Sequence, residues 1–100
     1  MPHIASEYPD LDKYKDRYGD FYYKKGTYIY HNPYGPAYIT ESSTRYFIQG
    51  KLHRLDGPAV ILPNGEEIYY INGEKLSKEK FEMHPERLRF LGKEHLICLG

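Results

Sequence analysis

The chain has 100 residues, which is enough for one domain with one modest core. Its fourteen basic and fourteen acidic residues give a formal net charge of zero. This balance argues against nucleic acid as a partner, because a basic stripe usually neutralises the phosphates. The single cysteine, Cys98, excludes an intramolecular disulfide and fits a reducing cytosol. No segment is apolar enough for secretion or for crossing a bilayer, so we expect a cytoplasmic protein with no membrane partner.

Tyrosine is unusually frequent, with twelve copies in a chain that has no tryptophan. Tyrosine favours β-strands, and it gives rigid, amphipathic contact area at a low entropic cost. Two interpretations follow. The rings could form a binding surface, or they could cover a thin sheet whose core is too small to enclose them.

Residues 12–18 fit either a helix or a strand. Apolar side chains at helical spacing support a helix that Gly19 would end. The alignment of residues 19–26 with 65–73, with one deletion, instead supports a strand followed by a hairpin turn at Gly19. We favour the strand, and we expect the alternating residues 27–30 to extend the same sheet.

An internal repeat organises the chain. Residues 31–39 match residues 53–61 in their His, Gly, Pro, Ala and Ile positions. A second signature, two aromatic residues, two linking residues and a glycine, occurs three times, at Tyr22–Gly26, Tyr46–Gly50 and Tyr69–Gly73. We therefore divide a single domain of residues 1–100 into three parts: divergent hairpin repeats at 12–49, the best-formed repeat at 50–73, and a helical cap and tail at 74–100.

The repeat at residues 50–73 predicts one β-hairpin. A two-residue Asn-Gly loop is the first expectation, but Pro63 argues against it, because Pro63 would flank the loop and has no N–H to donate. A type I turn with Pro63 at its second position and Gly65 in the left-handed region fits better. The resulting register pairs Leu62 with Glu66, Val60 with Ile68 and Pro58 with Tyr70. Both faces of this hairpin then carry apolar residues.

The histidines and turn residues of the repeats are assigned structural roles. His31 and His53 occupy equivalent positions, and we expect each imidazole to hydrogen-bond to backbone or to the neighbouring repeat. The alternative is a ligand-binding or general-base role. Gly57 permits a tight turn, and Pro58 can start a strand without a ladder donor. The full set of structural repeat and turn positions is His31, Gly35, Pro36, His53, Asp56, Gly57, Pro58, Asn64, Gly65 and Gly73.

The C-terminal part predicts two short helices. Ser77 is a helix N-cap, with Leu76 and Phe81 placed as a hydrophobic staple, and the helix should run to about residue 83. Pro85 can begin a second helical turn. The apolar side of that turn consists of Leu88, Phe90 and Leu91. Residues 95–99 form a brief apolar tail that could be an edge strand.

The segments 50–54, 56–60 and 69–73 resemble a repeat of small phage and bacterial proteins, with the pattern GKLHR-x-DGPAV…YYxNG. They are also similar to MORN-type repeats, although the Tyr-x-Gly-x-Trp core of that family is missing. Residues 76–81 look like the usual ending of the phage proteins. The resemblance covers residues 19–82. It implies an array of β-hairpins that holds other molecules, and it carries over no catalytic residues.

Metal and nucleophile chemistry have little support in the sequence. His95 and Cys98 have a plausible ligand spacing, but a structural zinc site needs four ligands, with thiolates dominant. A nucleophilic cysteine needs an adjacent base and an activating environment, whereas apolar residues flank Cys98. We therefore expect a buried thiol, no metal, no cofactor and no enzymatic activity.

The sequence thus predicts a mostly β domain, an antiparallel meander of β-hairpin repeats with a short C-terminal helical cap, in an α+β arrangement. The expected function is protein binding. The resemblance implies a phage protein that binds and inhibits a host defence factor in the bacterial cytoplasm. The expected contact residues are Tyr22, Tyr28, Tyr30, Tyr34, Tyr38 and Tyr46.

Two alternatives stay open at this point. Tyrosine rings together with Arg45 or Arg54 could sequester a nucleotide or another small molecule. Open hairpin edges could instead pair between chains and make a homodimer or a larger structural assembly.

Overall fold

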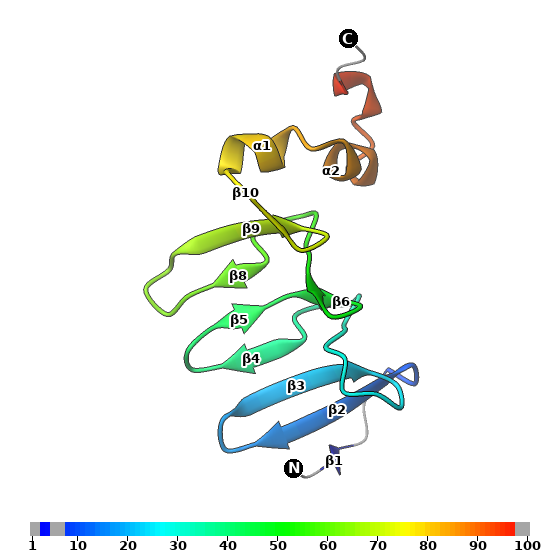
Figure 1. Cartoon of the computed structure of the whole chain (residues 1–100), viewed down its shortest axis with the longest axis vertical. Helices are drawn as coiled ribbons and strands as arrows, with labels where there is room; N and C mark the ends of the chain where they lie inside the picture. The colour runs from blue at the N-terminus through cyan, green and yellow to red at the C-terminus, as the bar shows by residue number, and fades with distance from the viewer. Residues whose placement is uncertain (1–2, 5–7, 98–100) are drawn as a thin grey trace.

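The computed structural model describes residues 3–4 and 8–97, and its main element is one antiparallel sheet (Figure 1). Its eight strands lie in the order β1-β2-β3-β4-β5-β8-β9-β10. Their bounds are His3–Ile4, Leu11–Asp16, Gly19–Lys24, Tyr38–Thr40, Thr44–Arg45, Val60–Ile61, Glu67–Ile71 and Glu74–Leu76. A separate two-stranded sheet pairs β6, Phe47–Ile48, with β7, Lys51–Leu52. The strands follow chain order in the main sheet, which confirms the predicted meander.

The ambiguous segment at residues 12–18 is a strand followed by a tight turn. Strand β2 pairs with β3, and Asp16 is the register partner of Gly19. The Asp16 carboxylate accepts hydrogen bonds from the backbone N–H groups of Tyr18 and Gly19, at 2.8 and 3.3 Å. Residues 27–30 do not extend the sheet as a strand. Only an isolated bridge joins Tyr30 to Tyr23, so this part of the prediction was wrong.

Gly19 is required by a close approach of two strands. It pairs with Thr40 of β4, and a Cβ atom at Gly19 would collide with the backbone carbonyl oxygen of Ile39. The hairpin β2–β3 can therefore pack directly against β4 only because position 19 carries no side chain.

The hairpin formed by β8 and β9 has the predicted register, with Val60 opposite Ile68. The N–H of Gly65 donates to the carbonyl of Leu62 at 2.9 Å, and Gly65 has a left-handed φ of 86°. Pro63 is thus the second residue of a four-residue turn, as expected. Buried residues lie on both faces of the hairpin, with Val60 on one side and Ala59 and Ile71 on the other.

The internal repeat is present in the backbone hydrogen bonds. The two segments that join successive hairpins, residues 31–37 and 53–59, are called the connectors here. Each connector ends in a fully buried alanine, Ala37 or Ala59. Equivalent backbone hydrogen bonds recur in the two repeats. Tyr22 N–H donates to Ala37 O, and Tyr46 N–H donates to Ala59 O in the same way. His31 N–H donates to Tyr22 O, and His53 N–H donates to Tyr46 O.

The turns at the glycines of the three signatures lie along one side of the sheet, at the right in Figure 1. In the second and third turns a left-handed residue precedes the glycine: Gln49 and Asn72 both have a φ of 51°. The N–H of Gly50 donates to Tyr30 O, and the N–H of Gly73 donates to Leu52 O, both at 2.8 Å. Each of these turns is therefore bonded to a segment about 20 residues earlier in the chain.

Two short helices follow β10 and lie at its end of the sheet (Figure 1). Helix α1 spans Lys78–Glu82, and the Ser77 hydroxyl accepts the Lys80 N–H at 3.2 Å, which confirms the N-cap. Helix α2 spans Pro85–Phe90 and has Pro85 in its first turn, as expected. The ring of Phe81 lies 4.6 Å from that of Tyr69 on β9. This contact fixes the helices onto the last hairpin.

Two predictions for the C-terminal part were wrong. Leu88 is buried, but Phe90 is 60% exposed, because α2 ends there and turns its last ring away from the core. A 3-10 helix at Glu94–Leu96 replaces the expected edge strand. Cys98 lies outside the described residues. Among the described residues, no helix has both the length and the apolar character to cross a membrane.

Candidate binding cleft

The two repeat histidines bind backbone, as predicted. The Nδ1 atom of His31 accepts the N–H of Gln49 at 2.9 Å, and Nδ1 of His53 accepts the N–H of Asn72 at the same distance. Both donors are the left-handed residues of the next turn. Burial lowers the pKa of both imidazoles, and this favours the neutral form that can accept the bond. Each histidine therefore orders the next signature turn along the chain.

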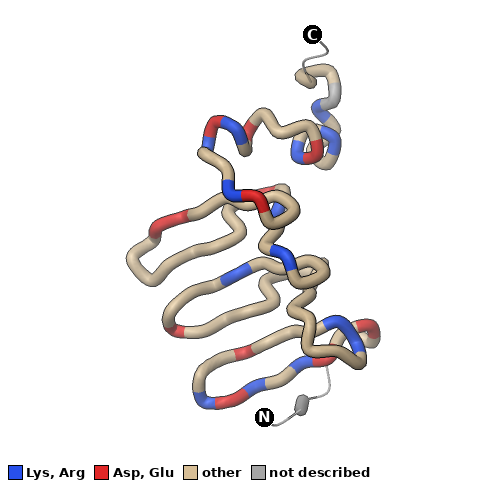
Figure 2. The backbone as a smooth tube through the Cα atoms, in the orientation of Figure 1, with Lys and Arg blue, Asp and Glu red and all other residues tan. Residues whose placement is uncertain are grey.

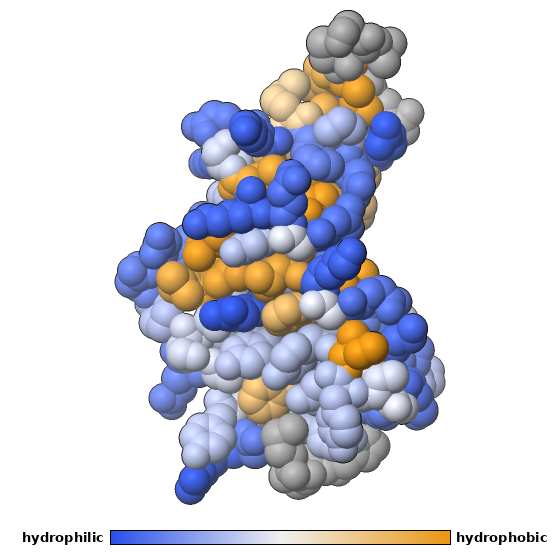
Figure 3. Space-filling model, viewed as in Figure 1, coloured by the Kyte–Doolittle hydropathy of each residue, from blue (hydrophilic) through white to orange (hydrophobic). Residues whose placement is uncertain are grey.

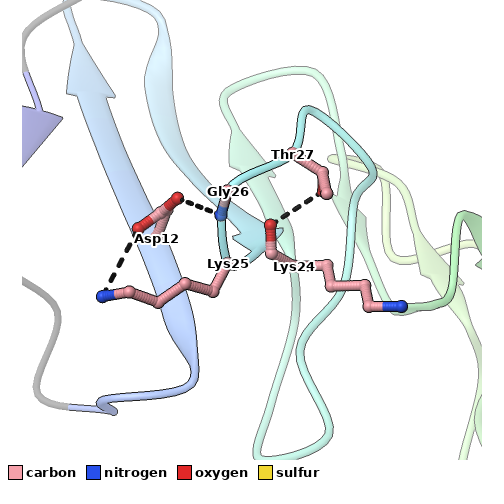
Figure 4. Close-up of polar contacts among 5 residues, drawn as sticks. All are labelled: Asp12, Lys24, Lys25, Gly26 and Thr27. Carbon is pink, nitrogen blue, oxygen red and sulfur yellow. Dashed lines mark hydrogen bonds and ion pairs between the residues drawn. The ribbon is translucent and has the colours of Figure 1, made fainter.

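At the first turn, a carboxylate instead of a histidine accepts the backbone N–H of the turn (Figure 4). Asp12 on β2 accepts the N–H of Gly26 at 2.8 Å, and its other oxygen lies 4.0 Å from Nζ of Lys25. The Thr27 hydroxyl donates to the carbonyl of Lys24 at 2.7 Å and closes the same turn. The last turn is also bonded to helix α2. The side-chain amide of Asn72 donates to the Glu86 carboxylate at 2.9 and 3.0 Å.

A cleft lies between the two connectors. It has a volume of about 330 Å³, and residues 32–35 and 53–56 form its walls together with Tyr46, Ile48 and Phe90. Rings and aliphatic groups dominate the walls, and Arg54, Asp56 and His53 contribute the charged and titratable groups. This composition is typical of binding sites, which combine apolar walls with a few placed polar groups.

Arg54 is held in a fixed position in the cleft. Its Nε donates to Asp56 at 2.9 Å, one terminal nitrogen donates to the carbonyl of Pro58 at 3.1 Å, and the guanidinium lies 4.0 Å from the centre of the Tyr46 ring. A Cβ atom at Gly57 would lie 2.8 Å from the guanidinium carbon. The absence of a side chain at Gly57 therefore makes room for Arg54, in addition to the turn role that the sequence suggested.

Tyr34 is an exposed but well-supported ring of the cleft. One face stacks on Tyr8, with ring centroids 4.4 Å apart and an interplanar angle of 19°. Its hydroxyl donates to the Asp10 carboxylate at 3.2 and 3.3 Å, and this hydrogen bond raises the pKa of Tyr34. Tyr34 is nevertheless 55% exposed, so much of it is accessible to a partner.

A second group of rings runs across the sheet and is called the aromatic cluster here. It consists of Tyr14, Phe21, Tyr23, Tyr28, Tyr30, Tyr38 and Phe47. Tyr30 is at its centre, stacked on Tyr23 at 5.1 Å and on Phe47 at 5.0 Å. Burial raises the pKa of Tyr23 to about 12. Most of these rings cover a thin sheet, which was the second interpretation of the tyrosine content.

The six tyrosines predicted to make contacts therefore have different environments. Tyr34 and Tyr46 line the cleft. Tyr30 and Tyr38 are half-buried in the aromatic cluster, and Tyr22 lies in the core with Leu11 and Ala37. Tyr28 is 76% exposed at the rim of the cluster. Sequence reasoning missed Phe90 as a cleft residue, because helical spacing predicted that it would be buried.

The surface around these sites has no dominant charge. Basic and acidic residues are interspersed along the chain (Figure 2), in agreement with the zero formal net charge. In the face shown by Figure 3, an apolar band crosses the β8–β9 hairpin between hydrophilic borders. Arg45, the other arginine named in the sequence, lies 5.7 Å from the Tyr38 ring and outside the cleft.

Within the described ranges, no group of three or more His, Cys, Asp or Glu side chains is arranged to hold a metal ion. The possible metal-ligand pair of His95 and Cys98 falls outside this finding, because Cys98 is not among the described residues. Comparisons of the chain with models of protein families, with curated proteins and with solved structures found no match.

Proposed function

We propose that this chain is a small non-enzymatic protein-binding module and that the cleft between the connectors is its contact surface. The observation that carries the proposal is the pair of exposed rings there, Tyr34 and Phe90, with Tyr34 held by Tyr8 and Asp10. The resemblance to phage proteins adds a bacterial host protein as the partner, and inhibition of a host defence factor as the consequence of binding.

The energetic argument is preorganisation. Large aromatic side chains supply most of the binding energy in many protein interfaces, and they do so best when few rotamers are lost on binding. Tyr34 and Tyr46 are already fixed, by the Tyr8 stack and by Arg54 respectively. Phe90 adds exposed apolar area at the same cleft. A partner therefore gains contact area without ordering these rings.

The test is capture from bacterial lysate with the chain immobilised, followed by mass spectrometry. The wild type is compared with Tyr34→Ala, with Phe90→Ala and with two matched controls, Tyr28→Ala and Met83→Ala, whose exposed side chains lie outside the cleft. We expect one or more proteins to be captured by the wild type and both controls and lost with the cleft variants. Equal capture by all five chains would contradict the proposal.

A second candidate function is sequestration of a nucleotide or a similar planar molecule. It is favoured by the guanidinium of Arg54 on the Tyr46 ring, since arginine and tyrosine faces both stack on bases. Mass spectrometry of the small molecules released by denaturing the purified protein tests it, together with thermal shifts in the presence of cyclic nucleotides. A co-purifying ligand that Arg54→Ala loses would favour this candidate over the first.

A further inference from the structure

We infer that helix α2 is held on the last hairpin by a proton-sensitive latch, and that mild acid releases the helix and withdraws Phe90 from the cleft. The latch consists of His53, Asn72, Glu86 and His84. The inference rests on the proposed protein-binding function, because it describes how the same cleft is regulated.

The four residues of the latch form one hydrogen-bonded chain. Asn72 lies in the turn between β9 and β10, beside α2 (Figure 1). Its backbone N–H donates to Nδ1 of His53 at 2.9 Å, and its side-chain amide donates to the Glu86 carboxylate at 2.9 and 3.0 Å. The backbone N–H of Glu86 donates to Nδ1 of His84 at 3.2 Å. Each end of the chain is therefore an imidazole acceptor, and a protonated imidazole has only donors.

His84 controls the helix itself. It is the N-cap of α2, a helix of six residues. A helix this short has little stability of its own and depends on its cap and on packing, here the burial of Leu88. Protonation of His84 removes the acceptor of the Glu86 N–H and places a positive charge at the positive end of the helix dipole. Both effects weaken α2 at the point where it is bonded to the turn.

His53 controls the turn to which α2 is bonded. Protonation of His53 puts a donor against the N–H of Asn72, a residue with a left-handed backbone. The turn then no longer holds the Asn72 amide against Glu86. Burial lowers the pKa of His53, and the nearby Glu86 opposes this shift without cancelling it. The folded state therefore favours the neutral ring, which is the form that closes the latch.

The charges around the latch do not reverse this effect. An imidazolium would attract Glu86, but partly exposed ion pairs stabilise little. Carboxylates, lysines and arginines generally keep their charge between pH 5 and pH 8, whereas imidazoles change theirs. The other charged groups near the latch are Arg54 and Asp56, which bond to each other, Lys51 beside the turn, and Arg87, which lies on the Phe81 ring. The histidines are thus the groups that respond to mild acid.

The latch is coupled to the cleft through Phe90. This residue follows Glu86 by about one helical turn and lines the cleft together with His53. When α2 leaves the turn, Phe90 leaves the cleft with it, whereas Tyr34 stays in place on Tyr8. Acid therefore removes one of the two exposed rings on which the proposed function depends.

The experiment is amide hydrogen exchange of the full chain at pH 8 and pH 5, measured by NMR and expressed as protection factors. The N–H groups of Leu88 and Leu91 report on α2, because they donate to carbonyls at its start and middle. The N–H of Tyr22, bonded to Ala37, reports on the sheet. We expect the protection of Leu88 and Leu91 to fall about five- to thirtyfold at pH 5, as for the loss of one or two ordinary hydrogen bonds. Their protection should be lower than that of Tyr22 at both pH values.

Two variants remove the titrating groups and keep an acceptor. His84→Asn retains a good N-cap, and His53→Gln retains a side-chain oxygen. Each should reduce the fall to about fivefold or less, and the double variant should abolish it. His31→Gln is the matched control, because His31 makes the same kind of bond to Gln49 without involving α2, so this variant should keep the full fall. Dispersed spectra at pH 8 show that each variant folds, and the single variants suffice if the double variant does not.

Three results would overturn the inference. They are equal protection of Leu88 and Leu91 at the two pH values, a wild-type fall in both His84→Asn and His53→Gln, and equal protection of α2 and Tyr22, since the helix would then open only with the whole fold. None of these measurements needs a partner, so such a failure leaves the proposed function standing. If α2 is released as expected but capture from lysate does not depend on the cleft, the latch is supported and the proposed function fails.

Discussion

His53 and Asn72 are joined by a 2.9 Å hydrogen bond from the Asn72 N–H to Nδ1 of the imidazole. Asn72 has a left-handed backbone, and the bond therefore holds this strained turn residue against the connector at residues 53–59. His31 and Gln49 repeat the arrangement at the same distance. Protonation of either Nδ1 replaces the acceptor with a donor and removes the bond.

Stability should therefore fall in mild acid. Burial is the main cause that lowers the pKa of His31 and His53 below 6.5; Lys24 and His84 lower it further, while Asp10 and Glu86 oppose the shift. Below pH 6.5 the unfolded chain binds more protons than the native one, so the free energy of unfolding decreases as the pH falls and is constant above that range. Urea unfolding between pH 5 and pH 8 measures this. The His53→Gln variant keeps an acceptor that cannot titrate and should show a shallower dependence. A stability that rises on acidification would contradict the prediction.

Gly19→Ala should destabilise the fold by about 1–3 kcal/mol, the usual result of forcing extra atoms into a packed site. The added methyl group collides with the backbone carbonyl of Ile39, which cannot move away as a flexible side chain could. Gly35→Ala is the matched control, because the nearest atom to its added Cβ lies 3.9 Å away and its φ is not left-handed. Denaturation midpoints of the two variants give the comparison, and equal midpoints would refute the explanation.

Gly57→Ala should change the cleft and leave the fold intact. The new methyl group displaces the Arg54 guanidinium, which can swing into solvent. The loss of stability should be no more than about 1 kcal/mol, the value of a partly exposed cation–π contact. The side-chain NMR signals of Arg54, shifted by the Tyr46 ring current in the wild type, should move toward random-coil positions. Unchanged signals would show that the guanidinium stays on the ring.

Asn72→Val should cost about 1–2 kcal/mol, since a β-branched residue is strained in the left-handed region. Asn72→Gly accepts that backbone and loses only the bonds to Glu86, so it should stay within about 0.5 kcal/mol of the wild type, as exposed substitutions usually do. Chemical denaturation of the two variants separates backbone strain from the contact with α2. A larger loss for Asn72→Gly than for Asn72→Val would reverse the interpretation.

The elements that could be predicted from sequence are those set by local chemistry. Pro63 and Gly65 determine one turn and its register, and Ser77 determines a helix start. These signals depend on backbone requirements that act within a few residues. The strand at residues 12–18 needed the repeat alignment as well, because its periodicity also fits a helix.

The cleft could not be predicted, because it joins parts of the chain that no local signal connects. Its walls come from the two connectors, and Phe90 reaches it only through the packing of α2 near the last turn. The tyrosines could not be sorted either. Both faces of the strands carry apolar residues, so alternation did not reveal that Tyr22 is buried, and Tyr34 lies in a connector, where no alternation applies.

The bond between a connector histidine and the next turn has a consequence for how such a chain can change in length. A connector and the turn that it orders are separate in sequence, so a deletion that removes one of them leaves a polar group unpaired. Gain or loss of whole units, such as residues 31–52, keeps every histidine with a turn. Asp12 and Glu86 remain at the two ends of the array in each case. The fold is therefore suited to growth by duplication in steps of one hairpin.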